Sequence, residues 1–217
     1  MNKPTTILCI LFLCTLISCS HNKKEDYSKQ KRHKTKINNN VIVDCHYTFE
    51  EAVAGTKAPK SVIEQLQLID VQYYSTDKMI HSGQILTNKL IANDLKQIFR
   101  FMLQQQFQIA KAIPIVNYNW NDNLSMKDNN TSSFCYRNTE YSKHALGMAI
   151  DINPYFNPLR WKNGYKYRSN KPEGAIYDST INGTLYPLHP IVQQFTKLHF
   201  RWGHNFTRNY DDQHFQR

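Results

Sequence analysis

His144 and Asp151 are the first two side chains in this sequence that could do chemistry together. They lie in the stretch SKHALGMAID, residues 142–151, and small or apolar residues separate them. A histidine nitrogen and a carboxylate oxygen are two of the ligands that zinc takes in a catalytic site, which needs three protein ligands and one open position. The spacing alone is equally compatible with a pair of surface or strand-capping residues.

A second pair of this kind stands near residue 217, in the stretch DDQHF at 211–215. His214 is a candidate for the third zinc ligand. Asp211, three residues earlier, can approach a water on the metal without binding the ion, which is where a general base must lie. Zinc bonds to nitrogen and carboxylate oxygen are about 2.0–2.2 Å long, so the fold must bring the two pairs together. Taken alone, the DxxH pattern also fits an ordinary surface pair.

A strand over residues 147–153 is expected to position Asp151. Side chains alternate between the two faces of a strand, so the even positions of GMAIDIN, all apolar, face the core. Ala149, Asp151 and Asn153 then face the other side, where Gly147 and Ala149 leave room for a ligand. Ser142 and Asn153 are expected to support the site from its surroundings.

The other predicted elements indicate an α+β domain. Strands are expected at 66–74 and 78–86, joined by a Ser-Thr-Asp turn. Thr87 or Asn88 can cap a following helix, whose apolar residues recur at helical spacing (Ile91, Leu95, Ile98, Phe99 and Met102) and are assigned to the core. Pro190 starts a short helix, and residues 154–188 are expected to be loops that line one side of a cleft. Strands and helices mix without regular alternation, which predicts a single compact domain with a small, mainly antiparallel sheet and flanking helices.

Three motifs in a fixed order resemble the zinc D-alanyl-D-alanine carboxypeptidase family, which includes vancomycin-resistance peptidases and L-alanyl-D-glutamate endolysins. Residues 142–151 match its SxHxxGxAxD signature. Upstream, Ser125-Met126 and NNTSSFCYR at 129–137 resemble its SM…NNTSxFNxR stretch. Downstream, Trp202-Gly203 and the DxxHF at 211–215 resemble its WGG…DxxHF ending. The resemblance runs from about residue 80 to the C-terminus.

The resemblance implies a role for each matching residue. His144, Asp151 and His214 are the implied zinc ligands, Asp211 the catalytic acid/base and Arg137 the oxyanion stabiliser. The implied fold is that of the hedgehog signalling domain and the D-Ala-D-Ala peptidases. Two positions depart from the family: its second glycine after the tryptophan is His204 here, and the next aromatic residue is Phe206 rather than tryptophan. These departures spare every implied ligand but put the substrate specificity in doubt. His204 is expected to lie outside the ligand set, because a filled fourth position would block catalysis.

The N-terminus is expected to be a lipoprotein signal peptide over residues 1–18. An uncharged apolar run from Ile7 to Ile17 is too short to span a bilayer, and LISC at 16–19 resembles a bacterial lipobox with Cys19 as the lipidated residue. An ordinary signal peptide with a chance cysteine is the alternative. Residues 19–40 are expected to be a basic, flexible tether, followed by a zinc peptidase domain over residues 41–217. The predicted location is therefore the bacterial cell envelope, as an exported, membrane-anchored lipoprotein facing the periplasm or the surface.

The basic charge of the chain resides largely in this tether. The formal charge is +10, and Lys3 contributes one unit. Residues 20–40 hold seven Lys/Arg and two acids, or +5, which leaves +4 for residues 41–217. No basic stripe interleaved with aromatics remains in the domain, so nucleic-acid binding is not expected. Anionic lipid headgroups or wall polymers are the expected partners of the basic segment.

Two cysteines, Cys45 and Cys135, remain after the signal segment and Cys19. An exported compartment permits a disulfide between them, and two buried free thiols are the alternative. The absence of any CxxC pattern in the sequence argues against a cysteine zinc site.

The sequence thus predicts a Zn²⁺-dependent peptidase that acts on peptidoglycan stem peptides, most closely a D-Ala-D-Ala carboxypeptidase. An L-Ala-D-Glu-type endopeptidase and a non-catalytic, zinc-containing lipoprotein that binds the wall are the alternatives. The sequence does not indicate an oligomeric state.

Overall fold

Strands β2 (Leu66–Tyr74) and β3 (Ile80–Asn88) form the longest hairpin of the protein in this computed structural model, which describes residues 41–139, 141–162 and 168–217. They pair antiparallel along their whole length. The short strand β1 (Ile42–Val43) pairs parallel with the other side of β3, which gives the order β1-β3-β2. The hairpin prediction is confirmed, although β3 lies two residues later than expected because the turn extends through Met79.

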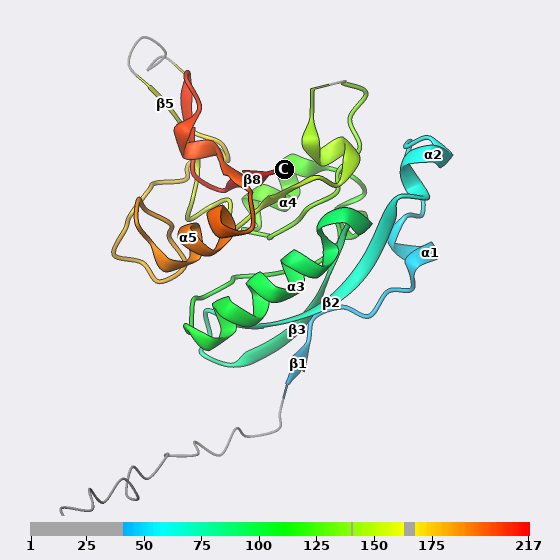
Figure 1. The fold of residues 1–217 in the computed structure, drawn as a ribbon, viewed down its shortest axis with the longest axis horizontal. Helices are drawn as coiled ribbons and strands as arrows, with labels where there is room; N and C mark the ends of the chain where they lie inside the picture. The colour runs from blue at the N-terminus through cyan, green and yellow to red at the C-terminus, as the bar shows by residue number, and fades with distance from the viewer. Residues whose placement is uncertain (1–40, 140, 163–167) are drawn as a thin grey trace, which may run out of the picture. The chain divides into compact units, whose positions relative to one another are not determined.

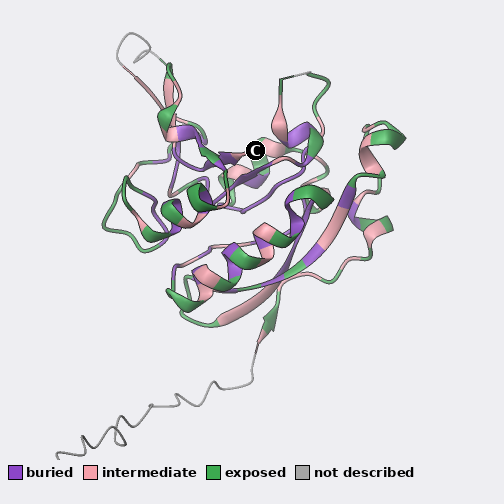
Figure 2. Cartoon of the chain, in the orientation of Figure 1, coloured by how far each residue is buried: buried purple, intermediate pink, exposed green. Residues whose placement is uncertain are grey.

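Helix α3 (Lys89–Gln104) lies across this hairpin (Figure 1). It begins after Asn88, one of the two predicted capping residues, whose side-chain oxygen accepts a hydrogen bond from Leu90 N at 3.0 Å and caps the helix. The apolar stripe assigned to the core is buried, and the opposite face of the helix is exposed (Figure 2).

Two smaller sheets form the C-terminal half. Strands β4 (Ala149–Asp151), β8 (His214–Gln216) and β6 (Arg201–Trp202) pair antiparallel in the order β4-β8-β6. Strand β5 (Leu159–Trp161) pairs antiparallel with β7 (Asn209–Asp211). Helix α5 (Pro190–Lys197) begins at the predicted proline and follows the N-cap residue His189.

The remaining elements are short helical turns in the connections between these sheets. They are α1 (Phe49–Ala52), α2 (Lys60–Ile63), η1 (Ile115–Tyr118), α4 (Asp122–Lys127), η2 (Lys143–Leu146) and η3 (Gly203–Asn205).

Two expectations about the C-terminal half need correction. Residues 154–188 are not loops alone, because Leu159–Trp161 is a strand. The expected strand over 147–153 covers only Ala149–Asp151, since Gly147 closes η2 and Asn153 turns the backbone into the left-handed region at φ +43°.

One apolar core joins the hairpin, α3 and the sheet that carries Asp151. It contains Ile69 and Leu95 from the first half together with Ile150, Phe195 and Phe215 from the second. The sheets are small and mainly antiparallel with helices packed around them, so the α+β prediction is confirmed.

None of the helices in the described ranges is long and apolar enough to cross a membrane. The expected signal peptide and tether, residues 1–40, lie outside the described residues. Cys45 and Cys135 are free thiols, and burial raises the pKa of each to about 11.

Candidate metal centre

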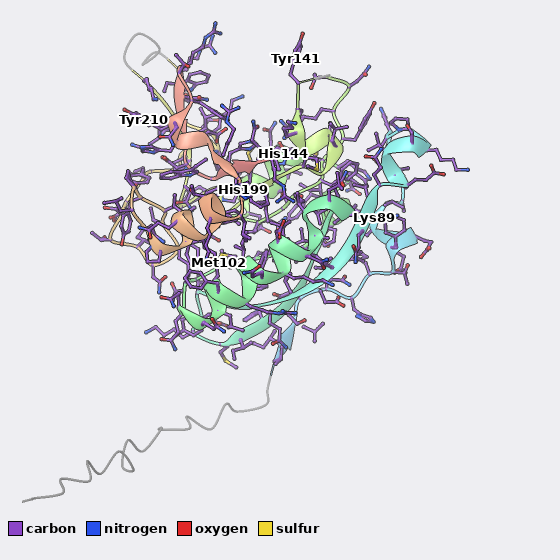
Figure 3. All side chains as sticks on the ribbon, viewed as in Figure 1. Lys89, Met102, Tyr141, His144, His199 and Tyr210 are labelled. Carbon is purple, nitrogen blue, oxygen red and sulfur yellow. The ribbon has the colours of Figure 1, made fainter. Side chains whose placement is uncertain are left out.

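His144 lies in η2, a turn held against the end of the long hairpin. The carbonyl of Gly147, the residue that ends this turn, accepts hydrogen bonds from Asn88 N and Thr87 Oγ1, both at 3.0 Å. Gly147 has φ +66°, and a Cβ there would lie 2.8 Å from Asn88 N, so no other residue type fits this approach without strain. The side chain of Asn88 donates to the carbonyl of Leu146 at 3.0 Å. These contacts fix the turn from which His144 projects into the domain interior, whereas Tyr141 points outward (Figure 3).

Asp151 and His214 are brought together by strand pairing. They are direct partners across the β4–β8 ladder, 63 residues apart in the chain. Side chains of such partners lie on the same face of the sheet and within reach of each other. The Nδ1 atom of His214 is 3.0 Å from Oδ1 of Asp151.

The three predicted ligands converge on one point. Nε2 of His144 is 3.0 Å from Nδ1 of His214 and 3.2 Å from Oδ1 of Asp151. A tetrahedral ion with bonds of about 2.0–2.1 Å separates its ligand atoms by about 3.3 Å, close to these three spacings. All three side chains are buried, and they form the one His/Cys/Asp/Glu group in the described ranges whose geometry suits a metal ion.

The outer hydrogen bonds of the two histidines orient their lone pairs toward this point. Nδ1 of His144 donates to the Ser133 carbonyl at 2.7 Å, and Nε2 of His214 donates to Oε1 of Gln216 at 2.9 Å. These partners assign the ring protons to the outward nitrogens, which leaves the inward nitrogens as acceptors. Two nitrogen lone pairs and a carboxylate oxygen within 3.2 Å of one another repel unless a cation lies among them. The residues therefore fit a divalent metal.

Asp151 and His214 each shift the pKa of the other. Burial opposes ionisation of Asp151, but His144 and His214 hold its pKa far below the usual range. Burial would lower the pKa of His214, but the hydrogen bond to Asp151 and its negative charge raise that pKa to about 9. A positive charge, whether proton or metal, is thus favoured at this position.

Asp211 lies beside the cluster as a half-buried residue whose carboxylate oxygen Oδ1 is buried. Its Oδ1 is among the few buried side-chain atoms in the described residues that have no hydrogen-bond partner. Burial and the negative charge of Asp151 raise the pKa of Asp211 to about 6. Asp211 and the three predicted ligands line one cavity, which has a volume of about 450 Å³.

Gly203 makes this arrangement sterically possible. A Cβ at this position would lie 2.6 Å from the Asp211 carbonyl oxygen, 2.8 Å from Asp211 Cβ and 3.1 Å from His214 Cβ. The glycine of the Trp-Gly motif therefore lets the β7–β8 hairpin pack closely enough to hold the carboxylate and the histidine side by side.

Arg137 lines the same cavity and forms an ion pair with Asp122. Asp122 belongs to the first turn of α4, which follows the N-cap residue Asn121. Burial raises the pKa of Asp122, and the charge of Arg137 opposes this shift. The sequence prediction missed Asp122, because this residue lies three positions before the Ser125-Met126 motif and matches none of the motif positions. The available sequence signal was Asn121, a residue type that caps helices, directly before Asp122. It would have predicted the helical turn that positions Asp122.

The residues that depart from the family pattern lie at the edge of the site. Nδ1 of His204 is 2.6 Å from Oδ1 of the buried Asp212, and its ring stacks on Trp202 with centroids 4.4 Å apart. His204 is thus not part of the three-residue cluster, as expected. Phe206 lines the cavity, with its ring centroid 5.7 Å from that of His214.

Asn153 does not support the site, contrary to expectation. Its side chain accepts from Ala110 N and donates to the carbonyls of Gln108 and Gly183, so it bonds to two loops and to none of the predicted site residues. The strand ends at Asp151, and the backbone of Asn153 lies in the left-handed region. Ser142 does line the cavity.

Residues 136–217 match the family model described as D-alanyl-D-alanine carboxypeptidase. This match confirms the family resemblance. It covers less than half of the chain, and it includes all five predicted site residues but not residues 125–135 of the upstream motifs. No curated protein and no solved structure matches the chain. The match over residues 136–217 and the buried His–Asp–His group together indicate a metallopeptidase.

Proposed function

We propose that this protein is a zinc-dependent peptidase that hydrolyses peptidoglycan stem peptides in the manner of a D-Ala-D-Ala carboxypeptidase. The observation that carries the proposal is the convergence of His144, Asp151 and His214 beside the unpaired carboxylate of Asp211. Two imidazoles and one carboxylate are a ligand set typical of catalytic zinc, which leaves one position open.

The residues of the chain have distinct roles in this reaction. Zinc held by His144, Asp151 and His214 would supply Lewis-acid activation of water and of the scissile carbonyl near neutral pH. Asp211, with its raised pKa, accepts a proton from the attacking water and returns it to the leaving amine. Arg137, oriented by Asp122, supplies positive charge for the oxyanion that develops on the carbonyl oxygen.

Metal analysis combined with a digestion assay tests this proposal. The purified protein is expected to contain about one zinc ion per chain and to cleave muropeptides, read by mass spectrometry. His144→Ala is expected to lose both metal and activity. Asp211→Asn is expected to keep the metal and lose most turnover, while Asp178→Asn, an exposed acid in a loop, is the control.

The products distinguish the candidate activities. Release of terminal D-alanine supports the carboxypeptidase, and an internal cut supports an endopeptidase. Zinc-dependent binding without any cleavage, or full activity in Asp211→Asn, would contradict the proposed mechanism.

We also propose that the chain is exported and anchored to the membrane through a lipid on Cys19. The support is the sequence, in which an apolar signal-like run ends at LISC and a basic segment follows. Fatty-acid labelling of the wild type and of Cys19→Ser tests this, since the variant is expected to lose the label.

A further inference from the structure

A second cavity, of about 810 Å³, lies next to the metal centre. It shares two of its lining residues, Asn123 and Lys171, with the cavity that contains the metal cluster. Its size is in the range of pockets that bind small molecules or short peptides. A substrate that lies over the metal centre can therefore continue into this second cavity.

Backbone pairing connects the second cavity directly to the reacting groups. Lys171 exchanges two hydrogen bonds with Leu159, at 2.8 and 3.0 Å, and Leu159 is the cross-strand partner of Asp211. Residues two apart on a strand share a face, so Leu159 at the metal centre and Trp161 in the second cavity lie on the same side of β5. The strand β5 forms a continuous wall from the proposed base to the second cavity.

The second cavity carries an excess of positive charge. Among the described residues, its lining contains Lys127, Arg168 and Lys171 against one acid, Glu173. Within the described ranges, neither Lys127 nor Lys171 forms an ion pair. The charge of Lys171 reaches Asp122 in the neighbouring cavity, where it opposes the rise in the pKa of that carboxyl. An anionic group is the ligand that such a lining attracts.

The neutral residues of the lining suit a peptide. Asn121, Asn123 and Asn170 offer amide donors and acceptors of the kind that pair with peptide groups. Trp161 adds an aromatic surface, and its Nε1 donates to the Ser169 carbonyl at 3.0 Å, which holds the ring in place.

We propose that the second cavity binds a carboxylate on the part of the peptide substrate that lies away from the scissile bond, so that the protein selects acidic peptides. This inference rests on the proposed peptidase function and adds a specificity site to it. Lys127 and Lys171 are the residues that determine this preference.

A pair of synthetic peptides tests the proposal. One is a stem pentapeptide with a γ-linked D-glutamate whose α-carboxylate is free, and the other carries that group as an amide. The full-length wild type is expected to show a lower KM for the acid. Lys127→Ala is expected to raise the KM for the acid about two- to five-fold and to leave the amide unchanged, as for one partly exposed ion pair. Lys127→Glu is expected to have a larger effect, and added salt is expected to reduce the difference.

Lys197→Ala is the matched control, because Lys127 and Lys197 are both exposed lysines in the last turn of a helix. Lys197 does not line either cavity, so its removal is expected to change neither KM. A thermal unfolding curve of each variant tests whether the variant is folded.

Binding measurements separate this inference from the peptidase proposal. Calorimetric titration of Asp211→Asn, with and without Lys127→Glu, reports the preference for the acid without turnover. If both peptides are cleaved with equal KM values, the proposal of a second site is wrong and the peptidase proposal is supported. If no peptide is cleaved but the protein binds the acid more tightly and Lys127→Glu removes this preference, the peptidase proposal is wrong and the second site is supported. Absence of any preference in both measurements overturns the site.

Discussion

Replacement of Gly203 by alanine is a sharp test of how the site is assembled. The new Cβ would lie 2.6 Å from the Asp211 carbonyl oxygen. Ordinary contact begins near 3.4 Å, so the β7–β8 hairpin must move by about 0.8 Å. The backbone of Gly203 is not in the left-handed region, so the effect of the substitution is one of crowding and not of backbone strain.

The expected magnitude follows from this displacement. A shift of about 1 Å in a reacting group can reduce turnover about 100-fold. Overpacking of this kind also costs about 1–3 kcal/mol of the free energy of unfolding. Because His214 Cβ lies 3.1 Å from the new atom, zinc affinity is expected to fall as well.

The assay measures kcat on a stem pentapeptide, bound zinc and the melting temperature of Gly203→Ala. Gly55→Ala is the control, since Gly55 has φ +72° and only one neighbouring atom, at 3.6 Å, so the substitution strains the backbone without crowding a site. That variant is expected to lose stability of about 1 kcal/mol and to keep its activity. Wild-type kcat and zinc content in Gly203→Ala would refute the proposed packing.

Three further predictions concern the metal and a pH-dependent contact. Gln216→Leu removes the partner of His214 Nε2 and is expected to weaken zinc binding about 10- to 100-fold, measured by competition with a chelator dye; unchanged affinity would show that this hydrogen bond is not needed. In a sample whose free zinc concentration is about 100 times the Kd, removal of the zinc is expected to lower the free energy of unfolding by about 2.7 kcal/mol, or the Tm by roughly 5–10 °C. An unchanged Tm in calorimetry would argue against a resident metal. Burial would lower the pKa of His81, but hydrogen bonds to Asp77 and Asp44 raise it above its ordinary value. The stability from this contact is therefore complete below about pH 6.5 and is lost as pH rises through the raised pKa, so urea unfolding across this range should show a decline that His81→Gln removes; an equal decline in the variant would contradict the assignment.

The regular elements were predictable where the pattern of apolar residues is strong. The helical spacing of the apolar residues predicted the buried face of α3, and its start was predicted at Thr87 or Asn88. His144, Asp151 and His214 could be predicted as candidate ligands because the motifs that resemble a known family fix residue types at set positions. Their convergence, however, depends on the Asp151–His214 strand pairing, which links distant segments and leaves no local signal.

The missed features all depend on tertiary contacts. Strand β5 is only three residues long, and its pairing with β7 defines it more than its composition does. Asp122 acquires its role from the ion pair with Arg137, 15 residues away. Alternation predicted Asn153 as a strand residue, but its side chain bonds to two loops and its backbone lies in the left-handed region, after the end of the strand.

Asn88 connects the start of helix α3 to the turn that carries His144, through its side chain and its backbone amide. The same residue caps α3, binds the Leu146 carbonyl and binds the Gly147 carbonyl, next to the turn that carries His144. The start of α3 and the position of His144 therefore depend on the same side chain. A substitution that removes the Asn88 amide group removes both the helix cap and the bond to the Leu146 carbonyl, so it is expected to loosen the helix start and the turn together.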